Sequence, residues 1–328
     1  MPDLITKYLG LELKNPIIAA SCGFTDTVEK IVELEEKGCS AVVIKSIFEE
    51  EILREAEVEA AEMMKNHAMR ESFDYIDHHL KGIKVNQYID LINNAKKAVS
   101  IPVFASVNCS SGHEWLYFAK NIEESGADGL ELNMFILPSN PNKTAEDIEK
   151  LYLDILKKVK SEIKIPVAVK TSYYFANLSN MMIKIADTGV DGIVMFNRHY
   201  SPDFDIDEMK ITRSNVLSSP RELLLPLRWV ALLSDRLNCS IAASTGVHDG
   251  EDAIKMLLAG ADVVQVASTL YRNGPNQINN ILNKIVDWMN KHDYTSINDF
   301  RGKMSFKNIE NPHSWERVQF MKYFSNYK

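Results

Sequence analysis

Two lysines stand where short apolar runs end, Lys45 in AVVIKS and Lys170 in VAVKTS. A lysine at a strand end can act as a Schiff-base nucleophile, a phosphate ligand or a stabiliser of charge beside a cofactor. One such lysine alone is often only the solvated end of a strand. Two of them on different strands would converge over one barrel mouth, which favours a chemical role.

A second set of polar residues suggests a phosphate site. Ser244-Thr245-Gly246 ends one apolar run, and Ala267-Ser268 ends the next. In a barrel of parallel strands, the loops after the last two strands often bind phosphate through backbone N–H groups at a helix start. Gly246 would let the backbone approach closely, and Ser218-Ser219 before Pro220 would add donors at another helix start. A simple tight turn is the plainer alternative.

The apolar runs themselves number eight. Some follow a Gly-X-Asp or Gly-X-Ser sequence and most of the others follow a proline; they span residues 17–21, 41–46, 103–108, 129–133, 167–172, 192–197, 241–246 and 263–268. Eight buried strands separated by helical segments predict an α/β fold, a single (β/α)₈ TIM barrel with its active site at the C-terminal strand ends. The candidate residues are therefore Ser21, Lys45, Asn108, Asn133, Lys170, Asn197, Thr245 and Ser268.

Additional segments surround the predicted barrel. Residues 4–13 alternate around a glycine, which predicts an N-terminal hairpin closing the bottom. Two insertions are expected, 49–98 after the second strand and a hairpin over 198–213 after the sixth; the part between the helices of the first insertion could cover the site. We expect residues 1–304 to form the barrel domain and 305–328 to be an aromatic extension packed on the barrel or a subunit interface.

The charge, hydropathy and cysteine content of the sequence argue against several classes of protein. A net charge of −8 over 328 residues gives no reason to expect nucleic acid or an anionic membrane as partner. No apolar run has the roughly 18 residues that span a bilayer, and the N-terminus lacks a signal-peptide core. The four cysteines lack CxxC spacing. We therefore expect a cytoplasmic protein without disulfides or a metal site.

Several motifs together resemble the dihydroorotate dehydrogenase family. NPIIAAS, AVVIKS, GLELN, IPVAVK, GIVMFN and ASTGVHDGEDAIKMLLAGADVVQVAS follow the family's order and spacing over about residues 4–303. That family is a flavin mononucleotide (FMN) barrel. The resemblance implies an FMN-dependent oxidoreductase that transfers hydride between flavin N5 and a CH–CH bond of a dihydroorotate-like or dihydropyrimidine-like ring. It also implies a diffusible or protein electron acceptor and a homodimer.

The resemblance further assigns roles to residues. Lys170 would sit by the flavin N1–C2=O edge and stabilise the anionic reduced flavin, and Lys45 would touch both flavin and substrate. Together with Lys45, the residues Asn133 and Asn197 would hold the substrate; Arg198, next to Asn197, is a further predicted substrate contact that the resemblance does not supply. The cofactor-binding set implied is Ala20, Ser21, Lys45, Ser46, Asn108, Asn133, Lys170, Asn197, Ser218, Ser219, Ser244, Thr245, Gly246, Ala267 and Ser268.

The sequence departs from the family where the catalytic base is expected. After GLELN the family carries a short motif whose Cys or Ser is the base, whereas this chain reads LNMFILPSNPN. Aligned without gaps, the base position is Ile136; with a small insertion it is Asn140, and neither is a competent base. Ser139 could substitute if a relay activates it. The family's substrate loop after the second strand is also replaced, and Arg198 stands where the family prefers a small hydroxyl residue.

These departures leave several functions open. The chain could be a family member that kept the flavin and changed substrate, or an authentic dihydroorotate dehydrogenase with a relocated base, for which His199 is another candidate. From a different class, it could be a phosphosugar aldolase or isomerase that forms a Schiff base on Lys170 or Lys45. A flavin-binding barrel without turnover is the last alternative.

Overall fold

Eight parallel strands close into a barrel in a computed structural model that describes residues 2–50, 54, 73–108, 114–198 and 200–316. Within these ranges the strand order around the barrel is β4-β3-β13-β12-β9-β8-β7-β6, and β6 pairs back with β4. Their bounds are β3 Ile17–Ala19, β4 Ala41–Val43, β6 Val103–Asn108, β7 Gly129–Asn133, β8 Val167–Thr171, β9 Gly192–Met195, β12 Ser240–Ser244 and β13 Val263–Val266. The predicted TIM barrel is confirmed.

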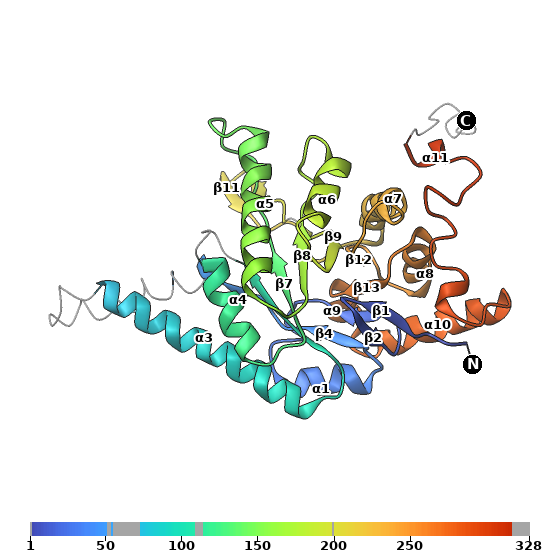
Figure 1. The fold of residues 1–328 in the computed structure, drawn as a ribbon, viewed down its shortest axis with the longest axis horizontal. Coiled ribbons are helices and arrows are strands. Elements are labelled where there is room, and N and C mark those ends of the chain that lie inside the picture. Colours follow the sequence, from blue (N-terminus) through green and yellow to red (C-terminus); the bar gives the residue numbers. More distant parts are fainter. Residues whose placement is uncertain (1, 51–53, 55–72, 109–113, 199, 317–328) are drawn as a thin grey trace.

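Helices surround the barrel, and neighbours in the chain pack against each other (Figure 1). They are α1 Val28–Glu36, α3 Phe73–Ala98, α4 Glu114–Glu124, α5 Ala145–Glu162, α6 Leu178–Ala186, α7 Leu224–Leu233, α8 Gly250–Ala259, α9 Ser268–Asn273, α10 Gln277–Lys291 and α11 His313–Glu316, with 3₁₀ turns at Pro220–Leu223 and Ile297–Asp299. Their apolar faces and the outer face of the sheet form one large core. None of the helices within the described ranges is long and apolar enough to cross a membrane.

The Gly-X-Asp sequences have a structural function at the start of three strands. Each aspartate exchanges hydrogen bonds with the first part of the preceding strand: its backbone N–H donates to a carbonyl there, and its carboxylate accepts the N–H of the same residue. The pairs are Asp128 with Val103, Asp191 with Val167 and Asp262 with Ile241. Each carboxylate also binds a cation, from Lys96, Lys160 and Arg301 respectively. The repeat therefore fixes the register of neighbouring strands.

The N-terminal hairpin closes the bottom of the barrel as predicted. Strands β1 (Thr6–Tyr8) and β2 (Leu11–Leu13) pair antiparallel. Tyr8, Leu9 and Leu13 are buried in a separate inner cluster with inward residues of the barrel strands. The ring of Tyr8 meets that of Phe104 edge to face, with centroids 5.9 Å apart. The lower half of the barrel is therefore filled by apolar side chains.

The two insertions differ in how well they were predicted. The hairpin after β9 is confirmed as β10 (Asp203–Asp205) and β11 (Lys210–Thr212). After β4, a short strand β5 (Ile47–Phe48) pairs with β6. The prediction of a loop between two helices in the first insertion is wrong from residue 73 onward, because α3 runs unbroken from Phe73 to Ala98. This stretch has no proline, and one glycine inside a helix costs only about 1 kcal/mol. Residues 55–72 lie outside the described part of the chain.

The described part of the C-terminal extension packs on the barrel's helices. The backbone N–H of Phe306 donates to the carbonyl of Ala231 in α7, and the guanidinium of Arg236 lies 4.5 Å from the Phe306 ring centroid. The indole of Trp315 donates to the carbonyl of Met304. The later aromatic residues of the extension lie beyond residue 316 and so outside the described residues.

We expect Asp128→Ala to lower the free energy of unfolding by about 1–3 kcal/mol, because it leaves the part-buried N–H of Val103 without its acceptor and Lys96 without its partner. Urea unfolding would measure the loss. The matched control is Glu208→Ala, which removes an exposed carboxylate paired with Lys210 in the β10–β11 hairpin and should change stability by less than about 0.5 kcal/mol. Equal losses in the two variants would contradict the structural function of the repeat.

Candidate functional site

A cavity of about 110 Å³ lies at the C-terminal ends of the strands. It is lined by Ala20, Ser21, Lys170, Asn197, Arg198, Ser218, Ser244, Thr245, Gly246, Val247, Gln265, Ala267 and Ser268. Most of these were predicted from the sequence. Val247 and Gln265 were missed; Gln265 lies inside the run VVQVAS, where a polar residue between valines is the signal that could have revealed an inward-facing side chain.

Lys170 is the buried cation of this cavity. It is the second-to-last residue of β8, and only 7% of it is exposed. Its Nζ donates to Oε1 of Gln265 over 3.2 Å and lies 3.6 Å from Oε1 of the buried Glu131. An ammonium held between two acceptors at the edge of a cavity can stabilise negative charge that develops there.

Amide and hydroxyl groups sit beside this lysine. The side-chain N–H of Asn197 donates to Oδ1 of Asn133 over 2.8 Å, so Asn133 touches the cavity's wall without lining it. Ser46 is similarly placed behind Ser21: the two hydroxyls are 3.0 Å apart, and Ser46 is also 2.7 Å from the hydroxyl of Ser106. These contacts fix the orientations of Asn197 and Ser21.

A strained turn after β12 forms another part of the wall. Thr245 and Gly246 both have positive φ, +78° and +81°, and the Thr245 hydroxyl donates to the carbonyl of Phe196. A Cβ on Gly246 would lie 2.2 Å from the backbone nitrogen of Leu223, so only glycine lets the turn pack this closely against the start of α7. The turn thereby presents backbone to the cavity.

Ser218 and Ser268 adjoin this turn. The Ser218 N–H donates to the Ser268 hydroxyl over 2.9 Å, and the Ser218 hydroxyl is 3.2 Å from Nε2 of His248. Burial, followed by the nearby positive charge of Arg272, lowers the pKa of His248, which favours the neutral imidazole. Ser219, by contrast, does not line the cavity, because its N–H is bound at 2.6 Å by Glu222 in a capping box.

Arg198 enters the cavity lining from the end of β9. Its Nε donates to Glu222 over 2.7 Å, and its Nη1 donates to the carbonyl of Val216. Burial alone would raise the pKa of Glu222, but the hydrogen bonds from Ser219 and Arg198 lower it overall, so the carboxylate stays charged. Arg198 is thus a fixed cation rather than a freely moving one.

Other predicted site residues lie away from the cavity lining. The side chain of Lys45 is exposed, and Asn108, at the end of β6, does not reach the lining. Ser139 and Asn140 lie in an exposed loop, where Oδ1 of Asn140 accepts the N–H of Asn142. His199 and residues 109–113 fall outside the described residues.

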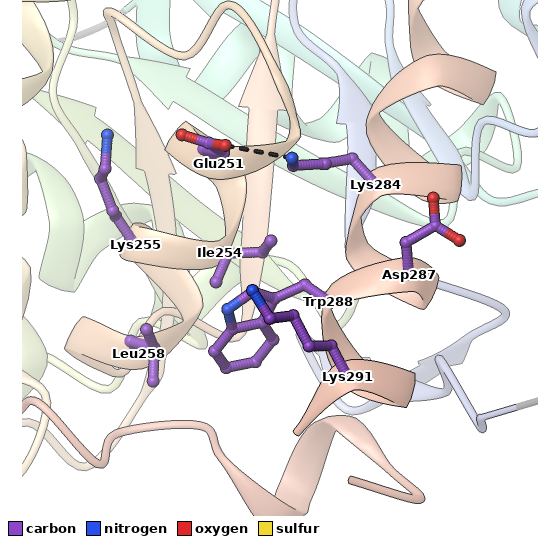
Figure 2. A pocket seen from close by; sticks show the side chains of 8 residues that line it. All are labelled: Glu251, Ile254, Lys255, Leu258, Lys284, Asp287, Trp288 and Lys291. Atoms are coloured by element: carbon purple, nitrogen blue, oxygen red, sulfur yellow. Dashed lines mark ion pairs between the residues drawn. The ribbon is translucent and has the colours of Figure 1, made fainter. Parts of the chain in front are cut away.

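A larger groove of about 420 Å³ lies elsewhere, on the outer surface between α8 and α10 (Figure 2). It is lined by Glu251, Ile254, Lys255, Leu258, Lys284, Asp287, Trp288 and Lys291. Glu251 and Lys284 form an ion pair across it at 3.1 Å. The groove contains no strand-end residue. The strand-end cavity is therefore the better candidate for chemistry, although it is smaller. Among the described residues, no group of three His, Cys, Asp or Glu could hold a metal ion.

Comparison with known proteins identifies the family. The family model described as dihydroorotate dehydrogenase matches residues 3–289. Among curated relatives, "Dihydroorotate dehydrogenase B (NAD(+)), catalytic subunit" of Thermoplasma acidophilum is 28% identical over 316 residues, covering 92% of this chain and 99% of the relative. "Dihydroorotate dehydrogenase A (fumarate)" of Lactococcus lactis subsp. lactis is 26% identical over 323 residues, with coverages of 92% and 99%. The chain therefore belongs to the dihydroorotate dehydrogenase family, and it is an oxidoreductase acting on a CH–CH bond.

Proposed function

We propose that the protein is an FMN-dependent oxidoreductase that transfers hydride to or from a CH–CH bond of a dihydroorotate-like or dihydropyrimidine-like ring. The observation that carries this proposal is the buried Lys170 ammonium, which shares one cavity with hydroxyl groups and with the strained Thr245-Gly246 turn. The location would be cytoplasmic and the assembly a homodimer.

The donor set of the cavity fits FMN. The Ser244-Thr245-Gly246 turn, with Ser218 and Ser268, offers hydroxyl and backbone groups suited to a phosphate. Ala20 and Ser21 offer a small-residue wall for a flat ring, and Lys170 offers a cation for the polar edge of that ring. When bound, the flavin would supply the hydride acceptor or donor.

The remaining side chains would bind and orient the substrate. The bonded pair Asn133 and Asn197 carries amide donors and acceptors that suit the alternating N–H and C=O groups of a pyrimidine ring. Arg198, held by Glu222, supplies a cation suited to a substrate carboxylate. Lys45 remains a proposed contact to flavin and substrate, and Ser46 a support for Ser21.

Two further questions are which ring the protein acts on and which electron acceptor it uses. Neither Ser139 nor Asn140 lines the cavity, which supports a family member that changed substrate over an authentic dihydroorotate dehydrogenase. The relatives named above differ in acceptor, NAD(+) in one name and fumarate in the other, so a diffusible or protein acceptor is proposed without choosing between them. A Schiff-base aldolase is disfavoured because Lys170 is already held by Gln265 and Glu131.

The function is tested by flavin analysis followed by anaerobic titration with L-dihydroorotate. We expect purified protein to contain or take up FMN, identified by mass after release. If the substrate has changed, dithionite will bleach the oxidised flavin band and dihydroorotate will not. Prompt bleaching by dihydroorotate would instead establish the authentic enzyme, and absence of any flavin uptake would refute the proposal.

Gly246→Ala should weaken FMN binding at least tenfold, which corresponds to about 1.4 kcal/mol, because the added Cβ would displace the turn from the start of α7. Fluorescence titration of the apoprotein with FMN would measure it. The matched control is Gly189→Ala, whose φ of +86° is equally unfavourable but whose Cβ would meet nothing within 4 Å. If both variants bind FMN with the same affinity, the turn is not part of the cofactor site.

Arg198→Ala should weaken the binding of orotate, which carries a carboxylate, about ten- to a hundredfold, in line with the roughly 1.5–3 kcal/mol of a charge-assisted hydrogen bond. Binding of uracil, which lacks the carboxylate, should change little. Perturbation of the flavin spectrum reports both affinities. An equal loss for the two ligands would show that Arg198 shapes the cavity and does not pair with a carboxylate.

A further inference from the structure

A buried carboxylate lies beneath the cavity, one layer deeper in the barrel than Lys170. In β7, Leu130 and Leu132 belong to the outer core, so the alternation of a strand turns Glu131 to the barrel interior. Glu131 pairs in register with Ala168, two residues before Lys170 on β8. Only 2% of Glu131 is exposed.

Gln265 connects this carboxylate to the lysine. Its Nε2 donates to Oε2 of Glu131 over 2.7 Å, and its Oε1 accepts from Lys170 Nζ over 3.2 Å. Strand β13, which carries Gln265, lies on the opposite side of the barrel from β7. Because an ionised carboxylate can only accept, Glu131 forces the amide of Gln265 to present its oxygen to Lys170. The three side chains therefore form one bridge across the barrel.

Packing of the barrel interior does not require polar side chains at these positions. The inward positions of TIM barrels are usually filled with apolar side chains, and the inner cluster below Glu131 follows that rule. A buried carboxylate has a desolvation cost of several kcal/mol unless it is paired, and Oε1 of Glu131 has no hydrogen-bond partner among the described residues, only the ion-pair contact with Lys170. Tyr8 adds no second negative charge there, because burial first, then the charge of Glu131, raises the pKa of Tyr8 well above its usual value.

We propose that Glu131 is a positioning residue that sets the reduction potential of the flavin through Lys170. Held through Gln265, the lysine ammonium keeps a fixed place at the cavity, and the carboxylate 3.6 Å behind it offsets part of its positive charge. Less net positive charge means less stabilisation of the negative charge that flavin gains on reduction. Glu131 therefore holds the potential lower than Lys170 alone would set it. This inference rests on the proposed FMN-dependent function.

The test is the midpoint potential of bound FMN, measured by dye-equilibrated spectroscopic reduction of the loaded protein. Glu131→Gln keeps the shape and removes the charge, so it should shift the equilibrium toward reduced flavin at least tenfold, which is about 30 mV more positive for a two-electron couple. Glu131→Asp keeps the charge and should shift it less. The matched control is Asp191→Asn, which removes a carboxylate paired with Lys160 at the other end of the barrel and should leave the potential unchanged.

The same substitutions are also made in a Lys170→Gln variant. This comparison separates an effect of Glu131 that acts through Lys170 from a direct effect of its charge on the flavin. Glu131→Asp keeps the comparison informative if Glu131→Gln is unstable alone. In Lys170→Gln, both Glu131→Gln and Glu131→Asp should move the potential much less than in the wild type. Shifts of the same size in both backgrounds would overturn the action through Lys170. If the wild type and Glu131→Gln both bind FMN and have equal midpoint potentials, this inference is overturned and the proposed function is not. If the wild type takes up no flavin, the proposed function and this inference are both overturned.

Discussion

Closure of the barrel is the constraint on which the site depends. Because β6 returns to pair with β4, the strands have no free edge and all their C-terminal ends meet at one rim. The strand pleat then decides which residues face inward. Lys170, Gln265 and Glu131 come from segments up to 134 positions apart in the chain and still meet in one polar bridge. The Gly-X-Asp hydrogen bonds fix the register that this convergence requires.

The interior of the barrel is divided into two halves of different chemistry. The lower half is closed by the hairpin residues Tyr8, Leu9 and Leu13 and is apolar. The upper half carries Glu131, Gln265 and Lys170, with Ser21, Ser46 and Ser106 in hydroxyl contact nearby. An apolar base excludes water from below the polar layer, which strengthens every electrostatic interaction in it. The arrangement is suited to charge stabilisation at the rim, and it links the fold of the N-terminus to the chemistry at the other end.

The positions where the sequence departs from the family's motifs are positions for which a catalytic or substrate-binding role was predicted. Most of the residues predicted to bind the cofactor line the cavity, from Ala20 to Ser268, whereas Lys45, Ser46, Asn108, Asn133 and Ser219 do not. Among the positions that depart from the family's motifs, Arg198 is bound to Glu222, and Ser139 and Asn140 are exposed. The proposed combination of a retained FMN site and a changed substrate is the pattern expected when a barrel keeps its redox chemistry and changes what it acts on, because the strand-end loops vary independently of the strands.

The eight strands, the N-terminal hairpin, the β10–β11 insertion and most of the cavity lining could be predicted from the sequence. Apolar runs of fixed length and the polar residues that end them are local signals. The sequence also indicated the missing base at Ile136 and Asn140. It did not reveal the unbroken helix from Phe73, since the propensities there are mixed. Three outcomes became visible only in the folded chain: Gln265 bridges Glu131 and Lys170, Lys45 is exposed while Arg198 is held by Glu222, and Ser219 caps a helix. Those outcomes depend on the register and pleat of strands distant in the chain, which no local pattern contains.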